Sequence, residues 1–120
     1  MSKIVQAVNA MIANPKLITK VIKGEREIFF LYKEKYKWSM AKNEQGHSLW
    51  FYPGTDSLEQ LASYEGFDWE DNVPMVFYQD TKIGTKEAKA SFAELYTLLN
   101  EKVFGVGEVL DDIISDADLG

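Results

Sequence analysis

The chain has 120 residues, 46% of them hydrophobic and 27% charged, which is ordinary for one globular domain spanning residues 1–120. It has no cysteine and only one histidine, which excludes disulfides, thiolate catalysis and metal sites built on cysteines or on several histidines. Residues 1–50 carry 9 Lys+Arg against 4 Asp+Glu, a net charge of +5, whereas residues 51–120 carry 4 against 15, a net charge of −11. Such an acidic half disfavours nucleic-acid binding by the whole surface.

Two short helices are predicted near the N-terminus. Residues 3–12 repeat apolar side chains at helical spacing, and Ser2 is placed to cap them. Asn14 followed by Pro15 is typical of a helix start and predicts a second short helix over residues 15–22. The first residues do not resemble a secretory signal, and no run of ~18 apolar residues predicts a membrane span. We therefore expect a cytoplasmic protein.

Residues 25–53 form a central stretch rich in aromatic and β-branched side chains, which favour strands. Their alternation predicts a meander of three antiparallel strands near residues 26–33, 35–42 and 47–52. Residues 43–46 read as the second turn, and this turn fixes the register of the last two strands. The predicted cross-strand pairs are Lys42 with His47, Met40 with Leu49, and Trp38 with Phe51.

The second half of the sequence predicts a fourth strand, with helices before and after it. Asp56 and Glu59 fit a capping box for a helix that ends before Gly66. A fourth strand is predicted over residues 73–79, at a sheet edge because proline at position 74 cannot donate to a ladder. Residues 79–84 are then expected to form a loop.

The longest helix is predicted over residues 86–103, after a cap at Thr85 and before a helix-ending Gly105. Its apolar stripe should be buried against the sheet, with Phe92, Leu95 and Leu99 at its centre. A last short helix is predicted over residues 108–115, and the acidic end at 115–120 is expected to fray.

The expected fold class is therefore α+β. An about four-stranded, mainly antiparallel sheet, with its central meander at residues 25–53, should pack with the short N-terminal helices and the long C-terminal helix.

The segment from Tyr64 to Asn72 has no clear period and mixes three large aromatic residues with four carboxylates. Aromatic side chains in an irregular acidic loop are typical of interface hot spots. In the alternative interpretation, Phe67 and Trp69 plug one end of the core and the carboxylates are solvated. The predicted protein-binding residues are Tyr64, Glu65, Phe67, Asp68, Trp69, Glu70 and Asp71.

No catalytic centre, metal site or cofactor is predicted. His47 is the only conventional general base, and no residue near it in the sequence would orient it. Gly-x-Ser-x-Gly and glycine-rich phosphate loops are missing. The acidic C-terminal residues lack the glycine and glutamate of an EF-hand. We therefore expect a protein that is not an enzyme.

The leading functional hypothesis is a small acidic protein–protein interaction module with a basic protein partner. Its most concrete form is an immunity or inhibitor protein that neutralises a basic enzyme such as a toxin nuclease. Two alternatives remain open, while the oligomeric state is not indicated. One is a small-ligand sensor or enzyme with a pocket between the sheet and the long helix, lined by Tyr32, Tyr36, Trp38 and Tyr78. The other is a weak RNA-binding sheet surface centred on Lys37, Trp50 and Tyr52.

Overall fold

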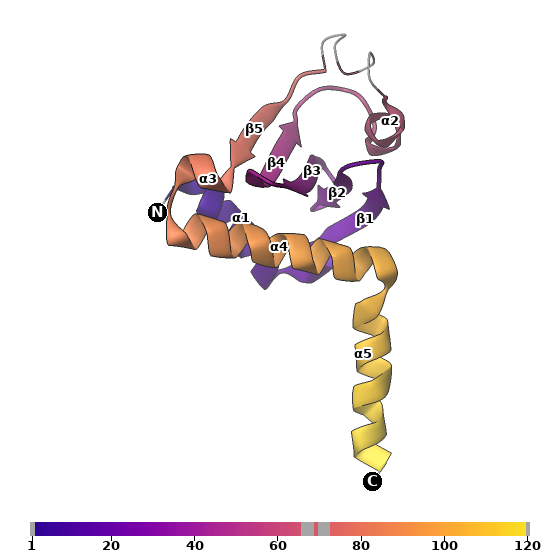
Figure 1. Cartoon of the computed structure of the whole chain (residues 1–120). Helices are drawn as coiled ribbons and strands as arrows, with labels where there is room; N and C mark the ends of the chain where they lie inside the picture. The colour runs from indigo at the N-terminus through magenta and orange to yellow at the C-terminus, as the bar shows by residue number, and fades with distance from the viewer. Residues whose placement is uncertain (1, 66–68, 70–72, 120) are drawn as a thin grey trace.

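The computed structural model describes residues 2–65, 69 and 73–119 of the chain (Figure 1). Five strands form one antiparallel sheet, and their order in the sheet is their order in the chain. The α+β class is confirmed, with five strands instead of four. The strands are β1 (Ile18–Lys23), β2 (Ile28–Tyr32), β3 (Tyr36–Asn43), β4 (Gly46–Tyr52) and β5 (Val76–Gln79).

Helices lie on both faces of this sheet. The N-terminal and the longest helix pack on one face, called here the inner face, and a short helix covers the other, the outer face (Figure 1). Among the described residues, no helix combines the length and the apolar character needed to cross a bilayer. The helices are α1 (Lys3–Ala13), η1 (Pro15–Leu17), α2 (Leu58–Ser63), α3 (Asp80–Ile83), α4 (Lys86–Phe104), α5 (Val106–Ser115) and η3 (Asp116–Leu119).

The helix predicted over residues 15–22 is wrong: one 3-10 turn, η1, leads directly into β1. The reason is a bulge in β1, where Lys20 has a φ of 50° and the pairing with β2 shifts. The bulge puts Ile18 and Val21 on the inner face, three residues apart, while Ile22 joins the outer face. A strand with this irregularity repeats its apolar residues at a helix-like spacing, and this spacing misled the prediction.

The register predicted for β3 and β4 is confirmed. Lys42 pairs with His47, Met40 with Leu49 and Trp38 with Phe51. Because the pleat alternates, this register sends Met40 and Leu49 to the inner face, where both are fully buried.

The inner core joins the sheet to α1 and α4. Phe92, Leu95 and Leu99 of α4 are fully buried against the sheet, as predicted. The ends of α4 are also as predicted: the Thr85 side chain accepts a hydrogen bond from the Ala88 N–H, and Gly105 ends the helix in the left-handed region at φ 66°.

The outer core is smaller and more polar. Phe29 and Tyr52 of the sheet pack against two buried leucines of α2. The α2 capping box is formed by Ser57 and Gln60, one residue later than the predicted Asp56 and Glu59. Ser57 is the better cap here because the Asp56 carboxylate instead accepts a hydrogen bond from the Tyr64 hydroxyl at 3.0 Å.

The segment before α4 has a shorter strand than predicted, and it contains a helical turn that was not predicted. Strand β5 begins at Val76, after Pro74, and lies at the sheet edge as predicted. The loop predicted at residues 79–84 contains a single helical turn, α3, which starts at Asp80 and ends at Gly84 with φ 83°. An aspartate in the first turn stabilises such a short helix through its dipole.

Candidate protein-binding site

A polar pocket of about 300 Å³ lies beside the outer core, between the β1–β2 turn and the end of α2. We call it the acidic pocket, because the charged groups of its described lining are three glutamates and one arginine. Three aromatic rings form its apolar part. Its lining residues are Glu25, Arg26, Glu27, Phe29, Ala62, Tyr64, Glu65 and Trp69.

Trp69 forms the aromatic wall of the acidic pocket. Its ring lies nearly parallel to Phe29, with 6.2 Å between centroids and 7° between planes, and edge-on to Tyr64 at 5.5 Å. The indole Nε1–H donates to the Tyr64 carbonyl at 3.2 Å, and the ring also contacts Tyr52 at 6.0 Å. These contacts fix the ring from three sides, so Trp69 joins the outer core while it still borders the pocket.

The β1–β2 turn supplies most of the charge. The turn closes through a hydrogen bond from the Gly24 N–H to the Glu27 carbonyl at 2.8 Å. Glycine suits this position, because a Cβ at position 24 would lie 2.9 Å from the Phe29 ring and the ring would have to shift. Partial burial raises the pKa of Glu27 above its ordinary value of 4.5; its own backbone N–H and Arg26 lower this pKa, and Glu25 raises it. A cation entering the pocket would relieve this cost of burying the Glu27 charge.

The structure brings together three of the predicted site residues, Tyr64, Glu65 and Trp69. The other four, Phe67, Asp68, Glu70 and Asp71, lie outside the described residues. Sequence reasoning missed the glutamates of the β1–β2 turn, because the helix predicted over residues 15–22 concealed the hairpin. The run of alternating charge after Gly24 was the signal that could have identified a turn at this place.

The alternative surface, Lys37, Trp50 and Tyr52, does not form an open binding face. Tyr52 is buried, and burial raises its pKa to about 12 although a hydrogen bond with Ser39 at 2.6 Å opposes the shift. The Lys37 ammonium donates to the carbonyls of Gly54 at 2.6 Å and Asp56. Trp50 is half-buried and packs against Phe77 of β5, with 5.3 Å between ring centroids. Two of these three side chains are therefore used within the fold.

A second pocket, of about 390 Å³, opens on the inner face between α1 and the sheet. We call it the aromatic pocket. The four residues predicted to line a ligand pocket are all present, but the helix beside them is α1, not the long helix α4. Small side chains on α1 leave the space open. The lining residues are Ala7, Ala10 and Met11 of α1 with Tyr32, Lys33, Tyr36, Trp38, Phe51 and Tyr78.

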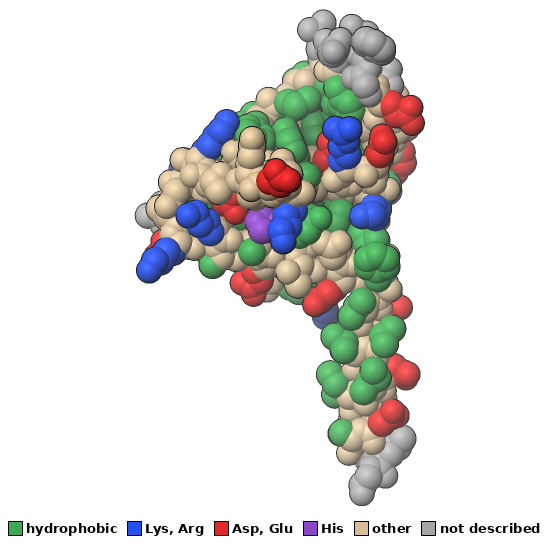
Figure 2. All heavy atoms as spheres, viewed as in Figure 1, with side chains coloured by type: hydrophobic (Ala, Val, Ile, Leu, Met, Phe, Trp, Pro, Cys, Tyr) green, Lys and Arg blue, Asp and Glu red, His purple; other side chains and the backbone are tan. Residues whose placement is uncertain are grey.

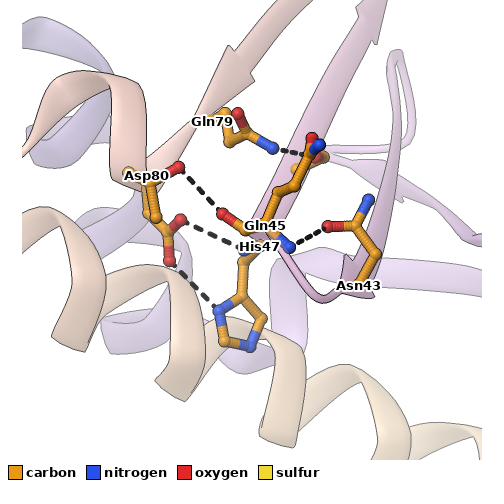
Figure 3. A network of polar contacts seen from close by, with 7 residues as sticks. Asn43, Gln45, His47, Gln79 and Asp80 are labelled. Atoms are coloured by element: carbon orange, nitrogen blue, oxygen red, sulfur yellow. Dashed lines mark hydrogen bonds and ion pairs between the residues drawn. The ribbon is translucent and has the colours of Figure 1, made fainter.

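His47 is held by a carboxylate from α3 (Figure 3). Its backbone N–H donates to Asp80 Oδ1 at 3.1 Å, and its ring Nδ1 lies 3.2 Å from Asp80 Oδ2. Sequence reasoning missed this partner because Asp80 is 33 residues away. A hydrolytic triad also needs a nucleophile, and no described hydroxyl hydrogen-bonds to the imidazole. A Cβ at Gly46 would collide with the Asp80 carboxylate, so the pair fastens the β3–β4 turn to α3.

No family model, curated protein or solved structure matches this chain. Across the described residues, no three His, Asp or Glu side chains are grouped so that they would hold a metal ion. The two pockets and their charges are therefore the features of the structure that bear on function.

Proposed function

We propose that the protein is a small interaction module that binds a basic protein partner through the acidic pocket and the predicted site residues outside the described ones, Phe67, Asp68, Glu70 and Asp71. Its most concrete form is an immunity or inhibitor protein, in the cytoplasm, that neutralises a basic enzyme such as a toxin nuclease. The module is not itself an enzyme. The net charge of −11 over residues 51–120 would speed association with a basic surface.

The observation that carries the proposal is the acidic pocket itself. It combines carboxylates from two separate chain segments with an immobilised aromatic wall. An arginine side chain suits this combination, because its planar guanidinium pairs with carboxylates and stacks on aromatic rings. Glu25 and Glu65 are exposed at the pocket, where they meet an incoming cation, while Trp69 offers a ring face or edge.

Arg26 competes with any cation that enters the acidic pocket. It is the one cation among the described residues that line the acidic pocket, and it lowers the pKa of Glu27 through its charge. With three glutamates against this arginine, the lining retains an excess of negative charge. A partner arginine would pair with the pocket carboxylates, and Arg26, which is exposed, can turn into water.

The proposal is tested by affinity capture from the native host at low and moderate salt. The bait is the full chain, compared with a double variant, Glu25→Gln with Glu65→Gln. We expect a stoichiometric basic protein on the wild-type bait and at least tenfold less on the variant, which corresponds to about 1.4 kcal/mol. Higher salt should weaken capture by the wild type.

The matched control is Glu87→Gln with Glu94→Gln, which removes two exposed charges of α4 away from the acidic pocket. This control keeps the loss of charge but leaves the acidic pocket unchanged. If both double variants lose the partner equally, overall charge is responsible and the pocket is not the site. If neither loses it, the proposal is wrong.

The two alternatives have unequal support. The RNA-binding alternative loses most of its surface, because Tyr52 is buried and the Lys37 ammonium binds two carbonyls. The small-ligand alternative keeps one specific observation: its four predicted residues meet in the aromatic pocket. Native mass spectrometry of the purified protein distinguishes them, because a small molecule held in that pocket would add its mass to the chain.

A further inference from the structure

Helix α5 carries an apolar face that its own chain leaves exposed. Val109, Leu110, Ile113 and Ile114 recur at helical spacing, and each is between 47% and 65% exposed. Phe104, at the end of α4 just before this helix, is 70% exposed. Figure 2 shows hydrophobic side chains running along α5 with acidic side chains at its margin. Contiguous apolar surface of this kind usually marks a binding face.

The charges of α5 restrict what covers this face. Its charged residues are all acidic: Glu108, Asp111 and Asp112, followed by Asp116 at the start of η3. An anionic membrane surface would repel such a helix, since membrane-bound amphipathic helices carry Lys and Arg on the polar face. Pairing of two α5 helices would bring like charges together. The face therefore fits an apolar surface with a basic rim.

The aromatic pocket is such a surface on the same chain. Five aromatic rings of the sheet and two alanines of α1 line it, and among the described residues of its lining Lys33 alone is charged. Lys33 and Glu34 both have left-handed backbone, at φ 56° and 61°, in a tight turn that carries Lys33 to the pocket. Lys35 follows, its ammonium 4.8 Å from the centroid of the Tyr36 ring, which lines the pocket. The turn is net positive although Glu34 lies between the two lysines.

A single chain does not join these two surfaces. At Gly105 the backbone takes a left-handed conformation, and α5 then leads away from the sheet and from α1 (Figure 1). We propose that α5 of one copy docks its apolar face in the aromatic pocket of a second copy, and that the two copies do so reciprocally. The acidic margin of α5 then meets Lys33 and Lys35 of the other copy.

Reciprocal docking gives a closed two-fold dimer with two equal contacts. Two equal contacts bury twice the surface of one helix in one pocket, which favours the reciprocal arrangement because stable interfaces bury ~1,200–2,000 Å². The acidic pocket is on the opposite face of the sheet, so this dimer leaves it accessible. The inference does not rest on the proposed binding of a basic partner.

Sedimentation velocity of the full chain over a range of concentrations tests the dimer. The first variant, Ile113→Asp with Ile114→Asp, changes only exposed residues of α5. The second, Ala10→Phe, fills the aromatic pocket from an exposed helix position. We expect a wild-type dimer and at least a tenfold weaker dimer for each variant. A control, Met75→Asp, places an acidic residue at an exposed apolar position that belongs neither to α5 nor to the lining of the aromatic pocket, and this variant should stay dimeric.

Mixing separates docking in the pocket from pairing of α5 helices. The α5 variant keeps its aromatic pocket and the Ala10→Phe variant keeps its α5, so an equal mixture restores one of the two contacts. We expect the mixture to form a heterodimer more readily than either variant alone forms a dimer. If Ala10→Phe fails to fold by circular dichroism, Lys33→Glu with Lys35→Glu replaces it as the pocket variant.

Four results would overturn the inference. They are a wild-type monomer at all concentrations, a dimer unchanged by the α5 variant, a dimer unchanged by the pocket variant, or a small molecule that co-purifies in the pocket. A dimer that both variants weaken and that mixing partly restores supports it.

Discussion

The two faces of the sheet are closed in different ways. The inner face is covered by α1 and the 19-residue α4, which bury an almost wholly aliphatic and aromatic core and leave the aromatic pocket open beside α1. Among the described residues, the six-residue α2 is the one α-helix on the outer face, so rings and polar contacts complete the cover: Trp69 stacks on Phe29, and Tyr52 shares a buried hydrogen bond with Ser39. A short helix cannot cover a sheet face alone. The turn residues around it therefore determine the chemistry of the pocket that remains.

The largest effect should come from the inner face. Phe92→Ala should lower the free energy of unfolding by about 3–5 kcal/mol, because the ring is fully buried and its removal leaves a cavity. Phe104→Ala, at an exposed ring, is the matched control and should change it by less than ~0.5 kcal/mol. Urea denaturation measures both. A loss below ~1 kcal/mol for Phe92→Ala would show that α4 does not seal this face.

Removing Trp69, the aromatic wall of the acidic pocket, should lower the free energy of unfolding by less than removing Phe92. Trp69→Ala should lower the free energy of unfolding by about 2–3 kcal/mol, because Trp69 is half-buried but loses its contacts with Phe29, Tyr52 and Tyr64. Urea denaturation again measures it. If the effect equals that of Phe92→Ala, the outer face is as tightly sealed as the inner one and the contrast between them fails.

Alkaline pH should destabilise the fold through Tyr52 of the polar outer core. The pKa of Tyr52 rises from 10.0 to about 12 in the folded protein, chiefly through burial. Because the folded state holds the phenol proton more tightly than the unfolded state, the protonated Tyr52 contributes to the stability of the fold. This contribution is complete below pH 10 and is lost as the pH rises through 12, by up to about 2 kcal/mol. Tyr52→Phe should lack this added loss. Thermal unfolding from pH 9 to 12 tests it, and parallel curves for the two proteins would contradict it.

The smallest effect concerns the acidic pocket. The folded-state pKa of Glu27 is raised, so ionised Glu27 costs stability once the pH rises above that pKa. Glu27→Gln should therefore be slightly more stable than the wild type at neutral pH, by less than ~1 kcal/mol because the side chain is partly exposed. The difference should vanish as the pH falls and Glu27 becomes protonated. Melting temperatures at pH 3 to 8 measure it, and a variant that is less stable at neutral pH would refute it.

The regular parts of the fold were predictable from the sequence. Clean alternation and the turn at residues 43–46 fixed the β3–β4 register, and the stripe of Phe92, Leu95 and Leu99 fixed α4. Strand β1 was not predictable in this way, because the bulge at Lys20 changes its period from two residues to three. Local patterns describe elements that obey their ideal period, and a bulge depends on pairing with another strand.

The candidate site was predictable only on one side. The aromatic and acidic composition after Tyr64 indicated a binding segment, and Tyr64, Glu65 and Trp69 do line one pocket. The opposite side, from Glu25 to Glu27, depends on a hairpin that was hidden by the error in β1. His47 and Asp80 illustrate the same limit, since a contact between distant segments leaves no mark in either local sequence.

Nuclear magnetic resonance tests the claim that the acidic pocket receives a cationic side chain. The indole N–H of Trp69 is the reporter, because this group donates to the Tyr64 carbonyl at the pocket wall. Short arginine peptides are titrated against the same peptides with citrulline. We predict a saturable shift of the Trp69 indole signal with arginine, no shift with citrulline, and a weaker response in Glu25→Gln with Glu65→Gln. Equal responses to both peptides, or an arginine response confined to the Trp38 signal, would contradict the claim.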